Sequence, residues 1–230
     1  MIPLRDTIRS RTFPIVTVGL LLLNALVFFQ QLRAGPLGER LVFAYGLVPG
    51  RLVHWDELGG PSGVARWLPL VTSQFLHGGF LHLAGNMLYL WIFGDNVEDR
   101  LGHGRFLLFY LLCGVAAGLT QVGFDPSSPI PTVGASGAIA GVLGAYLVSF
   151  PRARVLTFVP VFFIPWLVEI PAVVFLVLWF GMQVLSGLAS FGRELTGGVA
   201  WWAHVGGFVT GIALVWALAP SRSRRATRTG

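Results

Sequence analysis

The stretch 106–124, FLLFYLLCGVAAGLTQVGF, decides the fold class of this chain. It runs for 19 residues without Asp, Glu, Lys or Arg. A helix that crosses the hydrocarbon core of a bilayer needs about 20 mostly apolar residues, and its backbone polar groups must be satisfied within the helix. The stretch therefore predicts a transmembrane helix.

Five other stretches free of Asp, Glu and Arg lie on both sides of it. They span residues 14–32, 67–94, 126–151, 170–192 and 195–221. Prolines near the start of 126–151 keep that part from being helical. The apolar segment 155–168 is too short for a span and contains Pro160 and Pro165, so we interpret it as an interfacial or buried connection.

We therefore predict an all-α, polytopic membrane protein with six transmembrane helices. The membrane domain covers residues 14–220, between a cytoplasmic N-terminal segment 1–13 and a basic cytoplasmic tail 221–230. With the N-terminus inside, eleven of the sixteen arginines lie in inner segments and five in outer ones. Because inner loops of membrane proteins are richer in Lys and Arg, this bias places both termini in the cytoplasm.

Composition leads to the same class of protein. Hydrophobic residues make up 54% of the chain and charged residues 11%, against about 25% charged in an average globular domain. This argues against a water-soluble monomer and excludes intrinsic disorder, which needs few apolar residues. Cys113 is the only cysteine, so an intrachain disulfide and a cysteine-based metal cluster are excluded. The net charge of +6 favours orientation against a bilayer over nucleic-acid binding.

The first apolar stretch has one further interpretation. Arg5, Arg9 and Arg11 precede it, as in a signal peptide, but no small-residue cleavage site follows, so a membrane anchor is the simpler interpretation. A compact six-span layout with no targeting sequence and no added domain favours a bacterial inner (plasma) membrane.

Four polar residues inside the apolar stretches are candidates for function: His82, Asn86, Ser136 and His204. Each also has a simpler interpretation as a packing or interhelical hydrogen-bonding residue. Their depth distinguishes them. Ser136 and His204 each stand 16 residues before the inner end of their span, or ~24 Å at ~1.5 Å per residue. His82 has a similar depth and Asn86 lies one turn below it, so side chains from three helices are expected to meet.

Such a group has a known chemistry. A serine hydroxyl becomes a nucleophile when a base takes its proton, and histidine is the usual base. The oxyanion that forms needs hydrogen-bond donors, which a helix starting near Ser136, His82 and Asn86 would supply. No carboxylate lies at this depth, so a Ser–His dyad is predicted in place of a triad. No zinc-binding His-Glu-x-x-His pattern and no pair of intramembrane aspartates is present in the sequence.

The residues also carry a family resemblance. From about residue 14 to residue 220 the chain resembles the rhomboid intramembrane serine proteases, a six-helix bundle. The matching segments are 72–77 (TSQFLH), 82–86 (HLAGN), 98–102 (EDRLG), 134–137 (GASG) and 203–211 (AHVGGFVTG). Each segment alone is a weak signal, whereas their order and placement on the spans are together specific.

The resemblance implies a role for each matching position. Ser136 is implied as the nucleophile and His204 as the general base and acid, while His82, Asn86 and the Ser136 backbone N–H would form the oxyanion hole. Structural support is implied for His77, Glu98, Arg100, Gly134, Gly137, Gly207 and Gly211. The fifth span and the loop before the sixth would form a lateral gate and cap. Ala140 departs from members that place an aromatic ring there against the catalytic histidine.

The resulting prediction is a serine endopeptidase that cleaves in or near the transmembrane segment of membrane-protein substrates, without metal or cofactor. Its partners are those substrates and the lipid bilayer, with no nucleic acid. Two other functions remain open. One is a catalytically silent, client-binding scaffold or chaperone on the same fold. The other is a small transporter using His82 and His204 as proton relays, although no Asp or Glu lies mid-membrane. The sequence indicates neither the substrate nor the oligomeric state.

Overall fold

A computed structural model describes residues 1–57, 63–161, 164–191 and 198–220 of the chain. The predicted basic tail 221–230 and part of the predicted cap, residues 192–197, lie outside the described residues. Each of the apolar stretches contains one long helix. The long helices are α1 (Ile15–Arg33), α5 (Phe80–Leu101), α6 (His103–Phe124), α7 (Ser136–Ser149), α8 (Ala172–Ser190) and α9 (Trp201–Leu218).

Within the described residues, four helices are long and apolar enough to cross a membrane: α1, α6, α8 and α9. The helix α5 has 22 residues but ends in the charged segment 98–100. The helix α7 has only 14 residues, a length of ~21 Å. Its late start follows the prolines at 126, 129 and 131, as predicted. Together with the family described below, these apolar helices define an integral membrane protein.

Short helices connect α1 to α5 on the side of the bundle that the sequence analysis places outside. They are α2 (Pro36–Tyr45), α3 (Pro49–Val53), α4 (Pro69–Thr72) and two 3-10 turns, Gly63–Trp67 and Ser73–Phe75. The segment between α6 and α7 is tied to them by a bridge between Leu47 and Thr132. This network of short elements holds the start of α7 in place.

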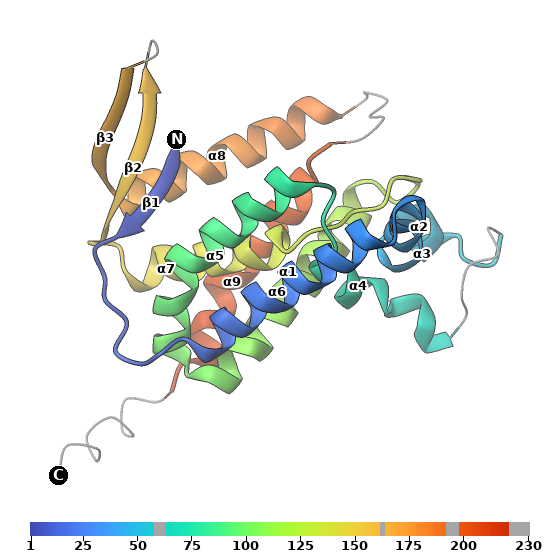
Figure 1. Cartoon of the computed structure of the whole chain (residues 1–230), viewed down its shortest axis with the longest axis horizontal. Helices are drawn as coiled ribbons and strands as arrows, with labels where there is room; N and C mark the ends of the chain where they lie inside the picture. The colour runs from blue at the N-terminus through green and yellow to red at the C-terminus, as the bar shows by residue number, and fades with distance from the viewer. Residues whose placement is uncertain (58–62, 162–163, 192–197, 221–230) are drawn as a thin grey trace.

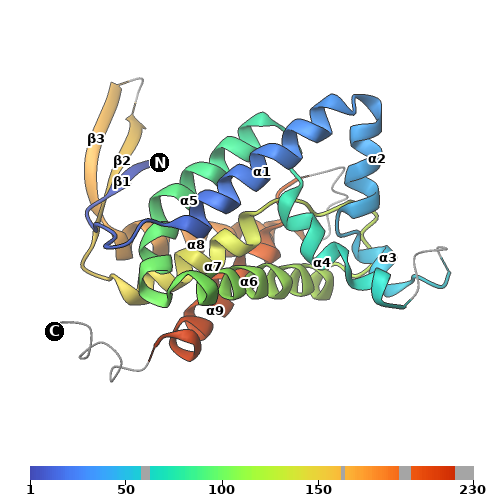
Figure 2. The same ribbon diagram turned by 60° about the horizontal axis from the view of Figure 1, so that its bottom comes forward.

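The helix α7 forms the centre of the bundle (Figures 1 and 2). All residues from Gly137 to Tyr146 are buried, and α7 contacts α5, α6, α8 and α9. Small residues let α9 approach it closely. A Cβ atom on Gly207 would lie 2.0 Å from the Gly137 carbonyl oxygen, and one on Gly211 would lie 2.0 Å from that of Gly141. The two backbones are therefore in direct contact, as in helix pairs with small residues four positions apart.

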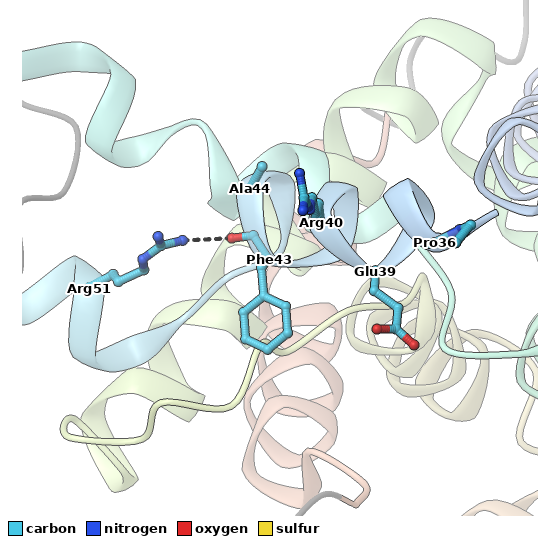
Figure 3. A pocket seen from close by; sticks show the side chains of 6 residues that line it. All are labelled: Pro36, Glu39, Arg40, Phe43, Ala44 and Arg51. Atoms are coloured by element: carbon cyan, nitrogen blue, oxygen red, sulfur yellow. Dashed lines mark hydrogen bonds between the residues drawn. The ribbon is translucent and has the colours of Figure 1, made fainter. Parts of the chain in front are cut away.

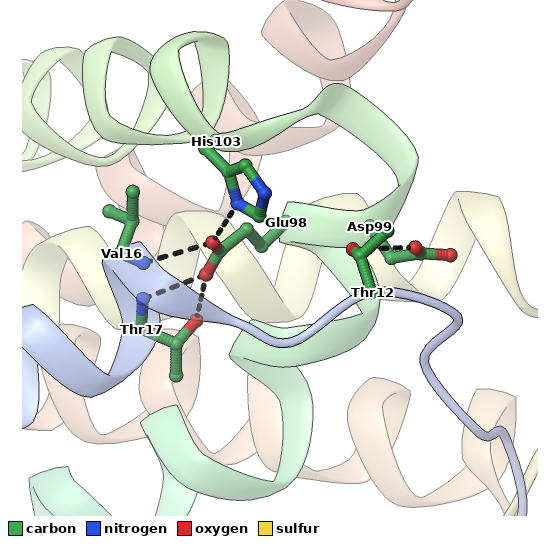
Figure 4. A network of polar contacts seen from close by, with 6 residues as sticks. All are labelled: Thr12, Val16, Thr17, Glu98, Asp99 and His103. Carbon is green, nitrogen blue, oxygen red and sulfur yellow. Dashed lines mark hydrogen bonds and ion pairs between the residues drawn. The ribbon is translucent and has the colours of Figure 1, made fainter.

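The end of the bundle that the sequence analysis places inside is held by Glu98 of α5 (Figure 4). Its fully buried carboxylate accepts hydrogen bonds from the backbone amides of Val16 (2.9 Å) and Thr17 (2.7 Å), and from the Thr17 hydroxyl (2.7 Å). These amides lie in the first turn of α1, where no intrahelical acceptor exists and negative charge is favoured. Arg100 lies over the Trp216 ring of α9, 5.0 Å from its centroid. Both residues therefore connect α5 to another helix of the bundle.

The prediction of an all-α fold missed a three-stranded antiparallel sheet. Its strands are β1 (Ile2–Asp6), β2 (Arg154–Val161) and β3 (Ile164–Pro171), in the order β1-β2-β3. In both views the sheet projects sideways from one end of the bundle, beside the start of α8. The segment interpreted as an irregular connection is thus a β-hairpin, and part of the N-terminal segment adds the third strand. β-Branched and aromatic residues favour strands, as in β2. The strand β1, however, lies far from the hairpin in the sequence, so local sequence does not indicate that the two pair.

Candidate active site

Ser136 and His204 meet at the contact between α7 and α9. Ser136 is the first residue of α7, and His204 lies in the first turn of α9. The Ser136 Oγ and His204 Nε2 atoms are 2.8 Å apart. The glycine contact between the two helices, one turn further on, brings the backbones close enough for this hydrogen bond. The predicted meeting of these two side chains is therefore present in the fold.

The opposite nitrogen of the same ring is also bound. His204 Nδ1 lies 2.7 Å from Gln183 Oε1, on α8. The rings of Trp179 and Trp201 lie against the imidazole, with centroids 5.9 and 6.3 Å away. Trp179 and Trp201 thus supply the aromatic contacts with His204 in a chain that has an alanine at position 140. Sequence reasoning missed Gln183, although it is the largest polar side chain in the fifth apolar stretch and so met the criterion used for the other candidates.

His82 and Asn86 of α5 lie beside the backbone that precedes Ser136. A Cβ atom on Gly134 would be 2.8 Å from His82 Nε2 and 3.5 Å from Asn86 Nδ2. Gly134 has φ = +123°, a conformation that L-residues rarely adopt, so glycine is required there both by space and by backbone. Asn86 is 8% exposed, and its Nδ2 has no hydrogen-bond partner within the described part of the chain. A buried amide donor without a partner costs free energy, which an incoming acceptor would recover.

His77 supports this corner of the site from behind. Its backbone N–H donates to Gln31 Oε1 (3.1 Å), and Gln31 Nε2 donates to the His77 carbonyl (3.2 Å). The His77 ring meets the His82 ring edge-on at 5.2 Å. These bonds connect the end of α1 to the start of α5 and help to fix the place of His82.

The structure separates the predicted residues into two groups. The side chains of Ser136, His204, His82 and Asn86 gather around residue 134 at one end of α7. Glu98 and Arg100 lie at the far end of α5, where they bind α1 and α9. The first group keeps a buried donor, Asn86 Nδ2, that no acceptor among the described residues engages, whereas the Glu98 carboxylate is saturated. The two groups therefore lie at opposite ends of α5.

A hollow outside this group lies on α2 and α3 (Figure 3). It is lined by Pro36, Glu39, Arg40, Phe43, Ala44 and Arg51. Arg51 Nη1 donates to the Phe43 carbonyl at 2.8 Å and closes one wall. None of the predicted site residues lines this hollow, and the side chains that line it include no serine, cysteine or histidine. The hollow is therefore separate from the group around Ser136.

Comparison with known proteins identifies the family of the chain. The Rhomboid domain family matches residues 64–221, so the chain belongs to the rhomboid family. It is 38% identical to "Rhomboid protease GluP" of Bacillus subtilis over 135 residues, which are 58% of this chain and 24% of that protein. It is 30% identical to "Rhomboid protein 1, mitochondrial" of Saccharomyces cerevisiae over 181 residues, 73% of this chain and 47% of the relative.

A plant relative extends the match along the chain. "RHOMBOID-like protein 4" of Arabidopsis thaliana is 34% identical over 190 residues, which are 81% of this chain and 41% of the relative. The matches thus cover less than half the length of each of these relatives. Family membership places the chain among rhomboid protease homologues, and the activity of this member is a separate matter.

Proposed function

We propose that this protein is an intramembrane serine endopeptidase that cleaves a peptide bond in or near the transmembrane segment of membrane-protein substrates. The observation that carries the proposal is the 2.8 Å contact between Ser136 Oγ and His204 Nε2 at the end of a buried helix. A hydroxyl in this position can transfer its proton to the imidazole while its oxygen attacks a carbonyl.

The reaction follows from the same geometry. Ser136 Oγ forms a bond to the substrate carbonyl carbon as His204 Nε2 takes the hydroxyl proton. The oxyanion lies toward the Asn86 amide, the His82 ring and the first backbone amides of α7. His204 returns the proton to the leaving amine, and a water molecule then hydrolyses the acyl-enzyme with His204 again as base. Asn86 Nδ2, which is buried without a partner in the described chain, is suited to receive that charge.

The site also restricts the substrate. A transmembrane helix presents no free carbonyl, because every carbonyl is engaged in an intrahelical hydrogen bond. Substrates must therefore unwind near the cut, which favours helix-weakening residues there, and the family resemblance implies a small residue just before the scissile bond. Six spans with both termini in the cytoplasm of a bacterial inner membrane would put the site ~6 Å below the outer surface, within reach of water.

Cleavage of a reporter transmembrane substrate by the purified protein in liposomes tests the proposal. Ser136→Ala and His204→Ala should each reduce cleavage to background, whereas Ser149→Ala, at the opposite end of α7, should leave it unchanged. A fluorophosphonate probe should label the wild type and not Ser136→Ala. Full activity in either alanine variant refutes the dyad. Absence of cleavage and labelling, with a cellular effect retained by Ser136→Ala, would favour the client-binding scaffold.

A further inference from the structure

We propose that Gln183 of α8 is a positioning residue that holds His204 in the tautomer and orientation needed to act as a base. The inference rests on the proposed function, since it concerns the same histidine. It begins from one contact, the 2.7 Å separation of Gln183 Oε1 and His204 Nδ1. Both side chains are buried, with 6% and 8% of their surfaces exposed.

The second bond of Gln183 determines which amide atom faces the ring. Its Nε2 donates to the backbone carbonyl of Trp179, one turn earlier on α8, at 3.3 Å. A carbonyl only accepts hydrogen bonds, so the atom facing Trp179 must be the NH2 group. The atom facing His204 is therefore the amide oxygen, which also only accepts. The hydrogen between Gln183 and the ring must then belong to His204 Nδ1.

This assignment has a direct chemical consequence. A neutral imidazole carries one hydrogen, so a protonated Nδ1 leaves Nε2 with its lone pair exposed. That lone pair points at Ser136 Oγ, 2.8 Å away. The alternative tautomer would place a hydrogen on Nε2 and leave no acceptor for the serine proton. Gln183 thus selects the one tautomer in which the dyad can start the reaction.

A neutral amide suits this location better than a carboxylate. An ionised side chain within a lipid-embedded helix carries a large desolvation cost, whereas an amide that makes both its hydrogen bonds does not. Gln183 therefore performs the orienting task of the acid in a Ser-His-Asp triad without its charge. Trp179 and Trp201 limit rotation of the ring, which Ala140, with a single methyl group, cannot do.

The proposal also links the base to the position of α8. Gln183 and Trp179 both belong to this helix, so displacement of α8 away from α9 would release His204 Nδ1. The simplest competing explanation is that Gln183 only joins two helices, as buried polar residues in membranes often do. The chain offers a control for it: Gln121 of α6 accepts from the backbone amide of Ala203, next to the histidine, at 3.3 Å.

The experiment compares Gln183→Met, Gln183→Glu and Gln121→Met in full-length protein reconstituted in liposomes. Methionine keeps the length of the side chain and removes the acceptor. We expect Gln183→Met to lower kcat about 100-fold, because loss of general-base catalysis has an effect of this size. KM should stay within about threefold of the wild-type value. Gln183→Glu keeps an acceptor, so it should retain most of kcat and move the acid limb of the pH–rate profile to higher pH. Gln121→Met should change kcat less than about threefold.

A spectroscopic measurement tests the inference independently of turnover. The 15N shifts of the His204 ring should show a protonated Nδ1 and an unprotonated Nε2 in the wild type, and a mixture of tautomers in Gln183→Met. This result would support the inference even if no substrate is cleaved. Failure of the proposed function would instead appear as full activity in Ser136→Ala. A protonated Nε2 in the wild type, an unchanged kcat in Gln183→Met, or an equal loss in Gln121→Met would overturn the inference.

Discussion

The helix α9 packs against two neighbours in different ways. Toward α7 it presents glycines, and the backbones touch: a Cβ atom on Gly144 of α7 would lie 2.1 Å from the Phe208 carbonyl oxygen. Toward α8 it presents rings, with Phe180 of α8 stacked on Phe208 at a centroid distance of 4.6 Å. The helix α7 is buried along most of its length, whereas much of α8 is exposed, including Leu178 and Leu185.

The difference separates two requirements of a dyad. Backbone contact between α7 and α9 sets the distance between Ser136 and His204, because no flexible side chain lies between the two backbones that could adjust to a shift of one helix. Side chains on α8 set the orientation of the histidine ring, and they can repack. Under the proposed function, displacement of α8 would leave the distance between Ser136 and His204 unchanged. Two further substitutions test this difference between the α7–α9 and α8–α9 contacts, and a third tests the neighbouring sheet.

The largest effect is expected at the α7–α9 contact. Gly207→Ala would place a methyl group 2.0 Å from the Gly137 carbonyl oxygen. The helices must move apart, which should cost about 3 kcal/mol of stability and reduce cleavage and fluorophosphonate labelling to background. Thermal unfolding and labelling of the purified protein measure both. The matched control is Gly181→Ala on α8, where no atom lies within 4 Å of the new methyl group, and equal losses in both variants would contradict the comparison.

A smaller effect is expected at the α8–α9 contact. Phe180→Ala removes one ring of the pair with Phe208, and the loss of the ring–ring interaction and of the partly buried ring surface should cost about 2 kcal/mol of stability. Since the Ser136–His204 distance does not depend on it, labelling of Ser136 by the probe should remain within about threefold of the wild type. Leu178→Ala, on the exposed side of α8, should leave stability and labelling unchanged. Loss of labelling in Phe180→Ala as complete as in Gly207→Ala would show that both contacts set the distance.

The smallest effect is expected in the sheet that connects α7 to α8. Asp6 of β1 accepts hydrogen bonds from the Tyr146 hydroxyl of α7 and from Asn96 Nδ2. Burial, with a smaller contribution from the nearby Asp95 carboxylate, raises the pKa of Asp6 from 3.8 to about 6. An acid whose pKa is higher in the folded state stabilises the fold below its unfolded pKa, and this contribution is lost as the pH rises through the folded pKa.

The wild type should accordingly lose about 1 kcal/mol between about pH 4 and about pH 7 through this carboxyl, after allowance for solvent screening. Asp6→Asn should flatten that part of the profile, as measured by thermal unfolding at several pH values in detergent. A steeper profile in Asp6→Asn than in the wild type would refute the assignment.

Sequence reasoning predicted the long helices and selected Ser136 and His204 as candidates for the same reason. Lipid tolerates few polar side chains, so apolar stretches mark helices and the polar exceptions within them mark candidates. Counting residues from the inner ends placed Ser136 and His204 at one depth, and the fold brings them together. The same criterion, applied to glutamine, would have selected Gln183, but it would not have identified His204 as its partner.

The sheet was missed for a different reason. The run from Val155 to Val159 is largely apolar on both faces, so periodicity does not distinguish a strand from a buried connection. Its partner strand, β1, was interpreted as part of a cytoplasmic segment because local sequence does not report pairing between distant parts of the chain. Long-range pairing depends on where the ends of the helices come to lie.

The amino-acid order alone determined which segments are apolar enough to enter lipid and which polar side chains they contain, because transfer into hydrocarbon depends on each residue's own chemistry. The tertiary structure alone decided that the histidine is bound on both nitrogens, that Asn86 keeps a donor without a partner in the described chain, and that α9 contacts α7 through backbone and α8 through rings. Those properties depend on the rotation of each helix about its axis and on the approach of its neighbours. No single segment contains that information.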